Sequence, residues 1–130
     1  MRSHKGLIAA VLTFGCLGAG SVRAEDIAMP VAVLQALDKI TARVQTIEAP
    51  VGETIRFSTL QIIARACYRR PAEEAPESTA FLDIWDMKRE QTPLAVFRGW
   101  VFASSPALSA VEHPVYDVWL LDCRAGSKGR

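Results

Sequence analysis

The chain has 130 residues, half of them hydrophobic, and a formal net charge of +1 at pH 7. This length suits one domain with a modest core. A charge this close to zero excludes the strongly basic surface on which nucleic-acid binding depends.

The first 24 residues have the pattern of a secretory signal peptide. Arg2 and Lys5 precede an apolar run of about 14 residues that ends at Gly20, and Ala24 closes the small-residue motif Val-Arg-Ala. A membrane span needs roughly 20 apolar residues, so the run predicts a signal peptide that is cleaved after Ala24. An uncleaved N-terminal anchor and a lipoprotein attached at Cys16 are the alternatives.

Removal of residues 1–24 changes both the charge and the cysteine content. Twelve of the 15 Lys and Arg residues and all 14 Asp and Glu residues remain, which gives a net charge of −2. Cys67 and Cys123 are the remaining cysteines. Two cysteines in an exported chain predict one structural disulfide. A redox-active pair or a metal site are the alternatives, but the chain has no C-x-x-C motif and a single histidine after cleavage.

The N-terminal half of the mature chain is expected to start with a loose arm over residues 25–31. Residues 31–39 fit either a short strand or a helical turn. From Ile40 the hydrophobic residues recur at every second position, so Ile40, Ala42 and Val44 are expected on the buried face of a strand. Residues 49–52 contain proline and glycine and should end that strand.

The middle of the chain predicts two further strands, over residues 54–57 and 60–68. The second is expected to be the central strand of a sheet. Its alternation places Leu60, Ile62, Ala64 and Ala66 on one face and Cys67 on the other. A solvated loop rich in proline and glutamate follows at residues 71–79.

The C-terminal half predicts strands over residues 81–87, 94–103 and 115–123. One helical turn is expected at residues 107–111, and residues 125–130 are expected to be a disordered tail. With no room for crossover helices, residues 32–124 are interpreted as a single β-rich domain. The expected fold is mainly β, a small antiparallel sandwich or a partly open barrel with one structural disulfide.

Candidate catalytic groups are few. Ser104 or Ser105, His113 and Asp117 could in principle form a nucleophilic triad, but no G-x-S-x-G motif is present to expose the serine. Glu112, His113 and Asp117 are too few for a metal site. We therefore expect no catalytic, cofactor-binding or metal-binding residues. His113 is expected to form local hydrogen bonds in a turn that Pro114 shapes.

Two carboxylates and the aromatic residues are the remaining candidates for a functional site. Asp83 and Asp86 are spaced for opposite faces of a strand and are interpreted as surface charges. The aromatic residues are expected to build the core. Residues 94–103 are apolar on both faces, which predicts either burial on both sides or one face that docks onto another protein. The interaction candidates are Trp100, Phe102, His113, Tyr116 and Trp119.

Several motifs together resemble an exported family of Gram-negative bacteria known as domain of unknown function 2155. They are Leu37-Asp38-Lys39, Arg65-Ala66-Cys67-Tyr68 with Pro71, Ala80 to Ile84, and the long stretch from Gly99 to Trp119 that closes at Cys123. The resemblance covers about residues 32–124. It implies a periplasmic protein and, more distantly, an accessory component on the periplasmic side of the proton-pumping NADH dehydrogenase.

The residues and the resemblance together predict a non-enzymatic structural or interaction domain whose partner is an envelope or inner-membrane protein. The mature chain is expected to have no transmembrane span. A binder of a small ligand or lipid is the alternative, and a serine hydrolase that uses Ser104 or Ser105 with His113 is a weaker one.

Overall fold

The computed structural model describes residues 15, 25–108, 111 and 113–126. The described part consists of eight strands and one short 3-10 helix. The elements are β1 (Ile27–Ala28), β2 (Val31–Asp38), β3 (Arg43–Pro50), β4 (Thr54–Phe57), β5 (Leu60–Arg69), β6 (Ser78–Asp86), β7 (Leu94–Phe102), η1 (Pro106–Leu108) and β8 (Tyr116–Arg124). No helix in this part of the chain is long and apolar enough to cross a membrane.

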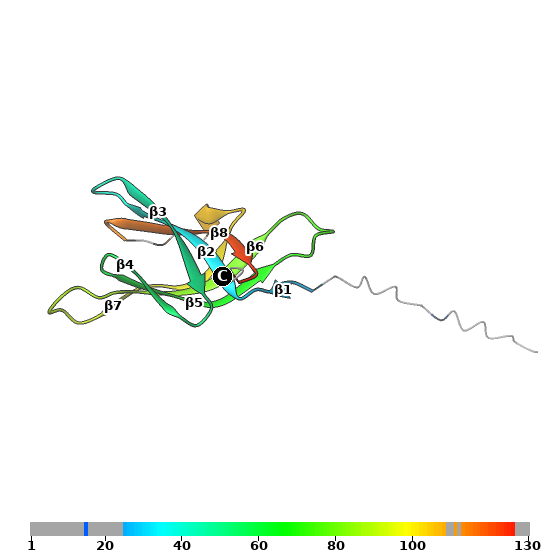
Figure 1. The fold of residues 1–130 in the computed structure, drawn as a ribbon, viewed down its shortest axis with the longest axis horizontal. Helices are drawn as coiled ribbons and strands as arrows, with labels where there is room; N and C mark the ends of the chain where they lie inside the picture. Colours follow the sequence, from blue (N-terminus) through cyan, green and yellow to red (C-terminus); the bar gives the residue numbers. More distant parts are fainter. Residues whose placement is uncertain (1–14, 16–24, 109–110, 112, 127–130) are drawn as a thin grey trace, which may run out of the picture.

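The strands form two antiparallel sheets that lie one above the other (Figure 1). The five-stranded sheet has the order β1-β5-β6-β7, with β4 also paired to β5, and the three-stranded sheet has the order β3-β2-β8. The sheets do not close into a barrel. The structure therefore confirms the mainly β, antiparallel fold class and favours the sandwich over the partly open barrel.

The core between the two sheets is mostly aliphatic. The largest fully buried side chains alternate along their strands with more exposed ones, as expected for sheets with one buried face. They are Leu34, Leu60, Ile62, Leu82, Ile84, Leu120 and Cys123. The expectation that aromatic residues build the core is wrong for most of them, because among the described residues only Phe57 and Tyr116 are buried aromatics.

A disulfide between Cys67 on β5 and Cys123 on β8 links the two sheets, with the two Cα atoms 5.7 Å apart. The alternation along β5 had placed Ala66, not Cys67, on the core face. The register shifts between Ala64 and Ala66, where a bulge adds one residue to β5. The bulge reverses the later side chains, because one extra residue moves them to the opposite face of the sheet. Cys67 therefore points to the core and meets Cys123.

The strand expected from Ile40 begins three residues later, and its predicted buried face is wrong. Residues 39–42 form the turn between β2 and β3, and the Asp38 carboxylate accepts hydrogen bonds from the backbone amides of Ile40 (2.9 Å) and Thr41 (3.2 Å). Ile40 is 77% exposed, and the core residues of β3 are Ile47 and Ala49. A local hydrogen-bonded turn therefore prevails over the hydrophobic alternation at this point.

Residues 31–38, which fitted either a strand or a helical turn, form strand β2. The expected N-terminal arm is partly paired, because Ile27 and Ala28 lie opposite Arg69 and Tyr68 of β5. A short 3-10 helix occupies the start of the expected helical turn, whose residues 109–110 lie outside the described part of the chain. Apart from Gly15, the expected signal peptide lies outside it too, as do residues 127–130 of the expected tail.

Candidate functional site

Strand β7 lies at an edge of the five-stranded sheet and is largely open to solvent. Its only strand partner among the described residues is β6. Leu94 is 66% exposed and Trp100 is 43% exposed. The prediction that this strand is buried on both sides is therefore wrong. An exposed apolar strand at a sheet edge is a site where another chain can pair or pack.

Three aromatic side chains form a row across the outer face of the five-stranded sheet, the face away from the core. Trp100 on β7 packs edge-to-face on its cross-strand partner Phe81 on β6, with ring centroids 5.4 Å apart. Tyr68 on β5 lies 6.1 Å from Trp100 between ring centroids. We call Tyr68, Phe81 and Trp100 the aromatic row. Contacts of this kind hold the rings in place without covering them, since each ring keeps some exposure.

A buried carboxylate lies beside the aromatic row. Asp83 is 5% exposed, so it is not the surface charge that the sequence predicts. Arg65 and the indole Nε1 of Trp85 donate hydrogen bonds to its two oxygens, at 3.2 and 2.8 Å. Arg98 is its cross-strand partner on β7. Arg65 thus pairs with this carboxylate, and Arg98 adds a second positive charge on the neighbouring strand.

His113 is held in a buried pair with Asp86, its side chain being 7% exposed. Its Nδ1 accepts hydrogen bonds from the backbone amides of Val115 (3.0 Å) and Tyr116 (3.2 Å). These are the local hydrogen bonds that were expected for His113. Nδ1 is therefore unprotonated, and the proton on Nε2 is donated to Asp86 at 2.9 Å. Asp86 is 3% exposed, so the prediction of a surface charge is wrong here too.

The pair also sets the acidity of the carboxyl group. Burial acts to raise the pKa of Asp86, but the hydrogen bond from His113 and the charge of Lys88 outweigh it, so the pKa lies below its ordinary value. Asp86 is thus a carboxylate at neutral pH. His113 also binds the amide of Val115 and that of Tyr116, the first residue of β8.

The structure does not bring the residues of the possible triad together. The backbone amide and hydroxyl of Ser104 both donate to the carboxylate of Glu77. Burial acts to raise the pKa of Glu77, but these bonds lower it below its ordinary value. Asp117 pairs with Lys39 at 3.3 Å. Ser104, His113 and Asp117 therefore each have a different partner. Ser105 lies in the turn after β7.

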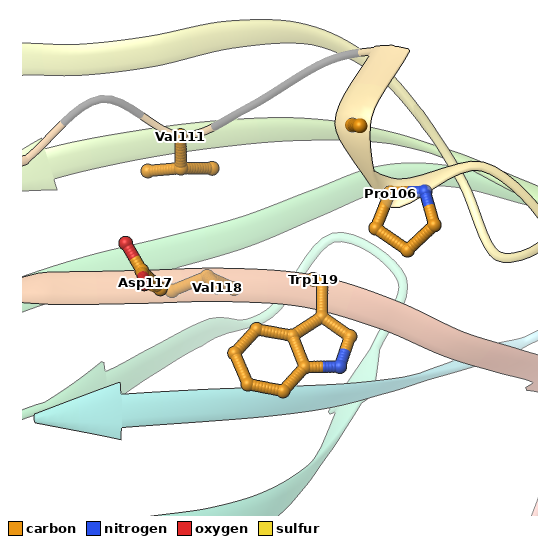
Figure 2. Close-up of a pocket in the computed structure, with 6 residues that line it drawn as sticks. Pro106, Val111, Asp117, Val118 and Trp119 are labelled. Carbon is orange, nitrogen blue, oxygen red and sulfur yellow. The ribbon is translucent and has the colours of Figure 1, made fainter. Parts of the chain in front are cut away.

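The remaining interaction candidates differ in exposure. Tyr116 is buried and packs edge-to-face on Phe57, with ring centroids 5.7 Å apart, so it belongs to the core. Phe102 is half-buried at the end of β7. Trp119 lines a pocket of about 370 Å³ with Pro106 and Val111, between β8 and the segment that follows β7 (Figure 2).

Tyr68 and Phe81 were not among the predicted interaction residues, although they complete the row around Trp100. The signal for Phe81 was its position on the opposite face from the core residues Leu82 and Ile84. No pattern in the sequence indicated that Tyr68 shares a face with Phe81, because the bulge in β5 changes which residues share a face.

Comparison with known proteins places most of the chain in one family. The family model described as "Uncharacterized protein conserved in bacteria (DUF2155)" matches residues 32–123. The uncharacterized protein RP359 of Rickettsia prowazekii (strain Madrid E) is 32% identical over 88 residues, which cover 68% of this chain and 57% of that protein. The match thus spans little more than half of the relative's length. No solved structure matches the chain.

Proposed function

The chain belongs to this DUF2155 family of uncharacterised bacterial proteins, and on that premise we propose that it is an exported, non-enzymatic interaction domain. Its partner is another protein of the bacterial envelope or inner membrane. The docking surface is the outer face of the five-stranded sheet around the aromatic row and the free edge of β7.

The exposure of Trp100 is the observation that supports this surface. A tryptophan that is 43% exposed and held by two neighbouring rings is already fixed in position. A partner that covers it gains apolar area and loses little side-chain entropy, which is the property of an interface hot spot. The adjacent Arg98 adds a second residue type that is enriched at interfaces.

The free edge of β7 adds a second means of attachment. Its nine residues include one charged residue and no proline, and a bulge at Val96 interrupts its pairing with β6, so the regular edge open to a partner is Phe97 to Phe102. An extended segment of a partner could add to the sheet through backbone hydrogen bonds. The proton-pumping NADH dehydrogenase is the first inner-membrane complex to search for such a partner, because the resemblance pointed to its periplasmic side.

We expect Trp100→Ala to weaken capture of the partner by about tenfold or more, since truncating a hot-spot tryptophan costs about 2 kcal/mol of binding energy or more. The measurement is a pulldown of the full chain from membranes in mild detergent, quantified by mass spectrometry. Because the substitution also removes the contacts with Phe81 and Tyr68, the melting temperature should fall by several degrees, and capture is compared at a temperature at which both proteins are folded.

Trp119→Ala is the matched control, because Trp119 lines the pocket beside β8 and lies outside the proposed surface. Capture should survive this substitution. Undiminished capture by the Trp100→Ala variant, or no partner in any membrane fraction, would contradict the proposal.

A binder of a small apolar ligand or lipid is the second candidate function, and the pocket at Trp119 is the observation that favours it. Its walls include Pro106, Ala107, Val111 and Val118, so they are mainly apolar. Native mass spectrometry of the protein purified from cells should then show an added mass that Trp119→Ala removes.

Export is the remaining part of the proposal. We expect the mature protein to begin at Glu25 and to be released with the periplasmic fraction, because the apolar run is too short for a stable span. Intact mass and N-terminal sequencing of the fractionated protein test this. A membrane-bound species that retains Met1, or one that is lipid-modified at Cys16, would show that the N-terminal segment is an anchor.

A further inference from the structure

A polar hollow of about 340 Å³ is lined by residues of both sheets, among them residues of β3 and β4. Arg43 and Gln45 line it from β3 of the three-stranded sheet, and Arg56 lines it from β4 of the five-stranded sheet. Thr41 and Ser58 line it from the adjoining turns. The hollow is separate from the aromatic row and from the pocket at Trp119, which are lined by other residues.

The lining carries more positive than negative charge. Neither Arg43 nor Arg56 forms an ion pair with any described residue. Asp38 is the one acidic residue in the lining, and its Oδ1 accepts hydrogen bonds from the amides of Ile40 and Thr41. Asp38 also lies opposite Arg43 in the β2–β3 ladder and offsets part of its charge, so the two arginines and one carboxylate leave the lining with a net charge of +1.

Ser58 places a fixed hydroxyl in the same hollow. Phe57 and Leu60 are paired residues, so Ser58 and Thr59 form a two-residue turn in which Ser58 has a φ of 53°. Glycine is usual at such a φ, and a serine there costs some backbone strain. The Ser58 Oγ lies 2.6 Å from the hydroxyl of the buried Tyr116. With Tyr116 as the donor, the Ser58 hydroxyl proton remains free for a ligand.

We propose that this hollow binds a phosphate group. Arginine donates two parallel hydrogen bonds to a phosphate, and two arginines from different sheets can bind it from two sides. The hydroxyls of Thr41 and Ser58 and the amide of Gln45 supply further donors, more than a carboxylate would use. The volume also exceeds that of one phosphate, which leaves room for part of an ester.

Titration of the full mature chain with inorganic phosphate, followed by amide NMR shifts, tests the proposal. We expect saturable shifts around residues 41–45 and 56–58. Arg43→Gln and Arg56→Gln should each weaken binding by about tenfold or more, because each removes the charge-assisted hydrogen bonds of one guanidinium group. Both arginines are exposed, so each variant should keep the fold, which its melting temperature verifies.

Arg98→Gln is the matched control, because it removes the same charge from β7, which does not line the hollow. If Arg98→Gln weakened phosphate binding equally, binding would depend only on the net charge of the protein, and the proposal would be overturned. Full binding by the Arg43→Gln/Arg56→Gln double variant, or equal binding of acetate, would overturn it as well.

The source of the phosphate is a further outcome of the test. Loss of binding to phosphatidylglycerol vesicles in the same two variants, without binding of glycerol phosphate, would identify a lipid headgroup. Binding of glycerol phosphate in solution would identify a soluble ester. Both support the phosphate site, and neither depends on the protein-docking surface around Trp100.

Discussion

Replacement of Cys67 by serine is expected to lower the free energy of unfolding by about 4 kcal/mol, and the melting temperature by roughly 20 °C. The disulfide joins residues separated by 56 positions, so breaking it releases a long loop in the unfolded chain. Breaking the disulfide also removes the one covalent side-chain cross-link between the two sheets among the described residues. Urea denaturation of the oxidised wild type and of the variant measures the difference.

Cys123→Ser should have the same effect as Cys67→Ser, because either substitution leaves the same bond unmade. The Cys67→Ser/Cys123→Ser double variant should be nearly as stable as either single variant, because it adds only the small cost of a second buried hydroxyl. Clearly unequal single effects, or two thiols that react with an alkylating agent in the native exported protein, would contradict the pairing.

The fold class and most strands follow from the sequence because they depend on local patterns. The alternation of residues 60–64 and the proline-rich segment before Ser78 each fix an element without reference to the rest of the chain. The pairing of Cys67 with Cys123 was predictable for a simpler reason, since removal of the expected signal peptide would leave these two cysteines.

The face of a strand is harder to predict than its existence. One extra residue in β5 sends Cys67 into the core, although the unbroken alternation places Ala66 there. The hydrogen bonds of Asp38 create a turn where alternation alone continues the strand to Ile40. Both cases depend on one backbone irregularity, which a hydrophobic pattern does not record.

The candidate site depended on contacts between distant parts of the chain. Burial of β7 was predicted from its own composition, but burial requires a covering element, and the described chain provides none over the outer face. Likewise His113 and Asp86 lie 27 residues apart, so no local spacing suggested that the two would pair. Trp100 was identified because an exposed docking face was one of the two outcomes expected for a strand that is apolar on both faces.

The second large effect is expected at the buried pair. His113→Ala should lower the free energy of unfolding by about 3 kcal/mol, because it leaves Asp86 buried without its hydrogen-bond donor. It also leaves the amides of Val115 and Tyr116 without their acceptor. Asp86→Ala should cost a similar amount. Since each single change already breaks the same bond, the double variant should cost less than the sum, by about 1–3 kcal/mol.

Acid titration of stability tests the same pair independently. The pKa of Asp86 is lowered below 3.8 in the folded protein, so its stabilising contribution is complete above the ordinary pKa and is lost as the pH falls below about 4. The stability difference between the wild type and Asp86→Asn should therefore shrink through that range. Because Asp38 and Glu77 also have lowered pKa values, both proteins should lose stability in acid, and only the difference reports on Asp86. A difference that stays constant down to pH 2, or single-variant costs that simply add, would mean that His113 and Asp86 are not energetically coupled.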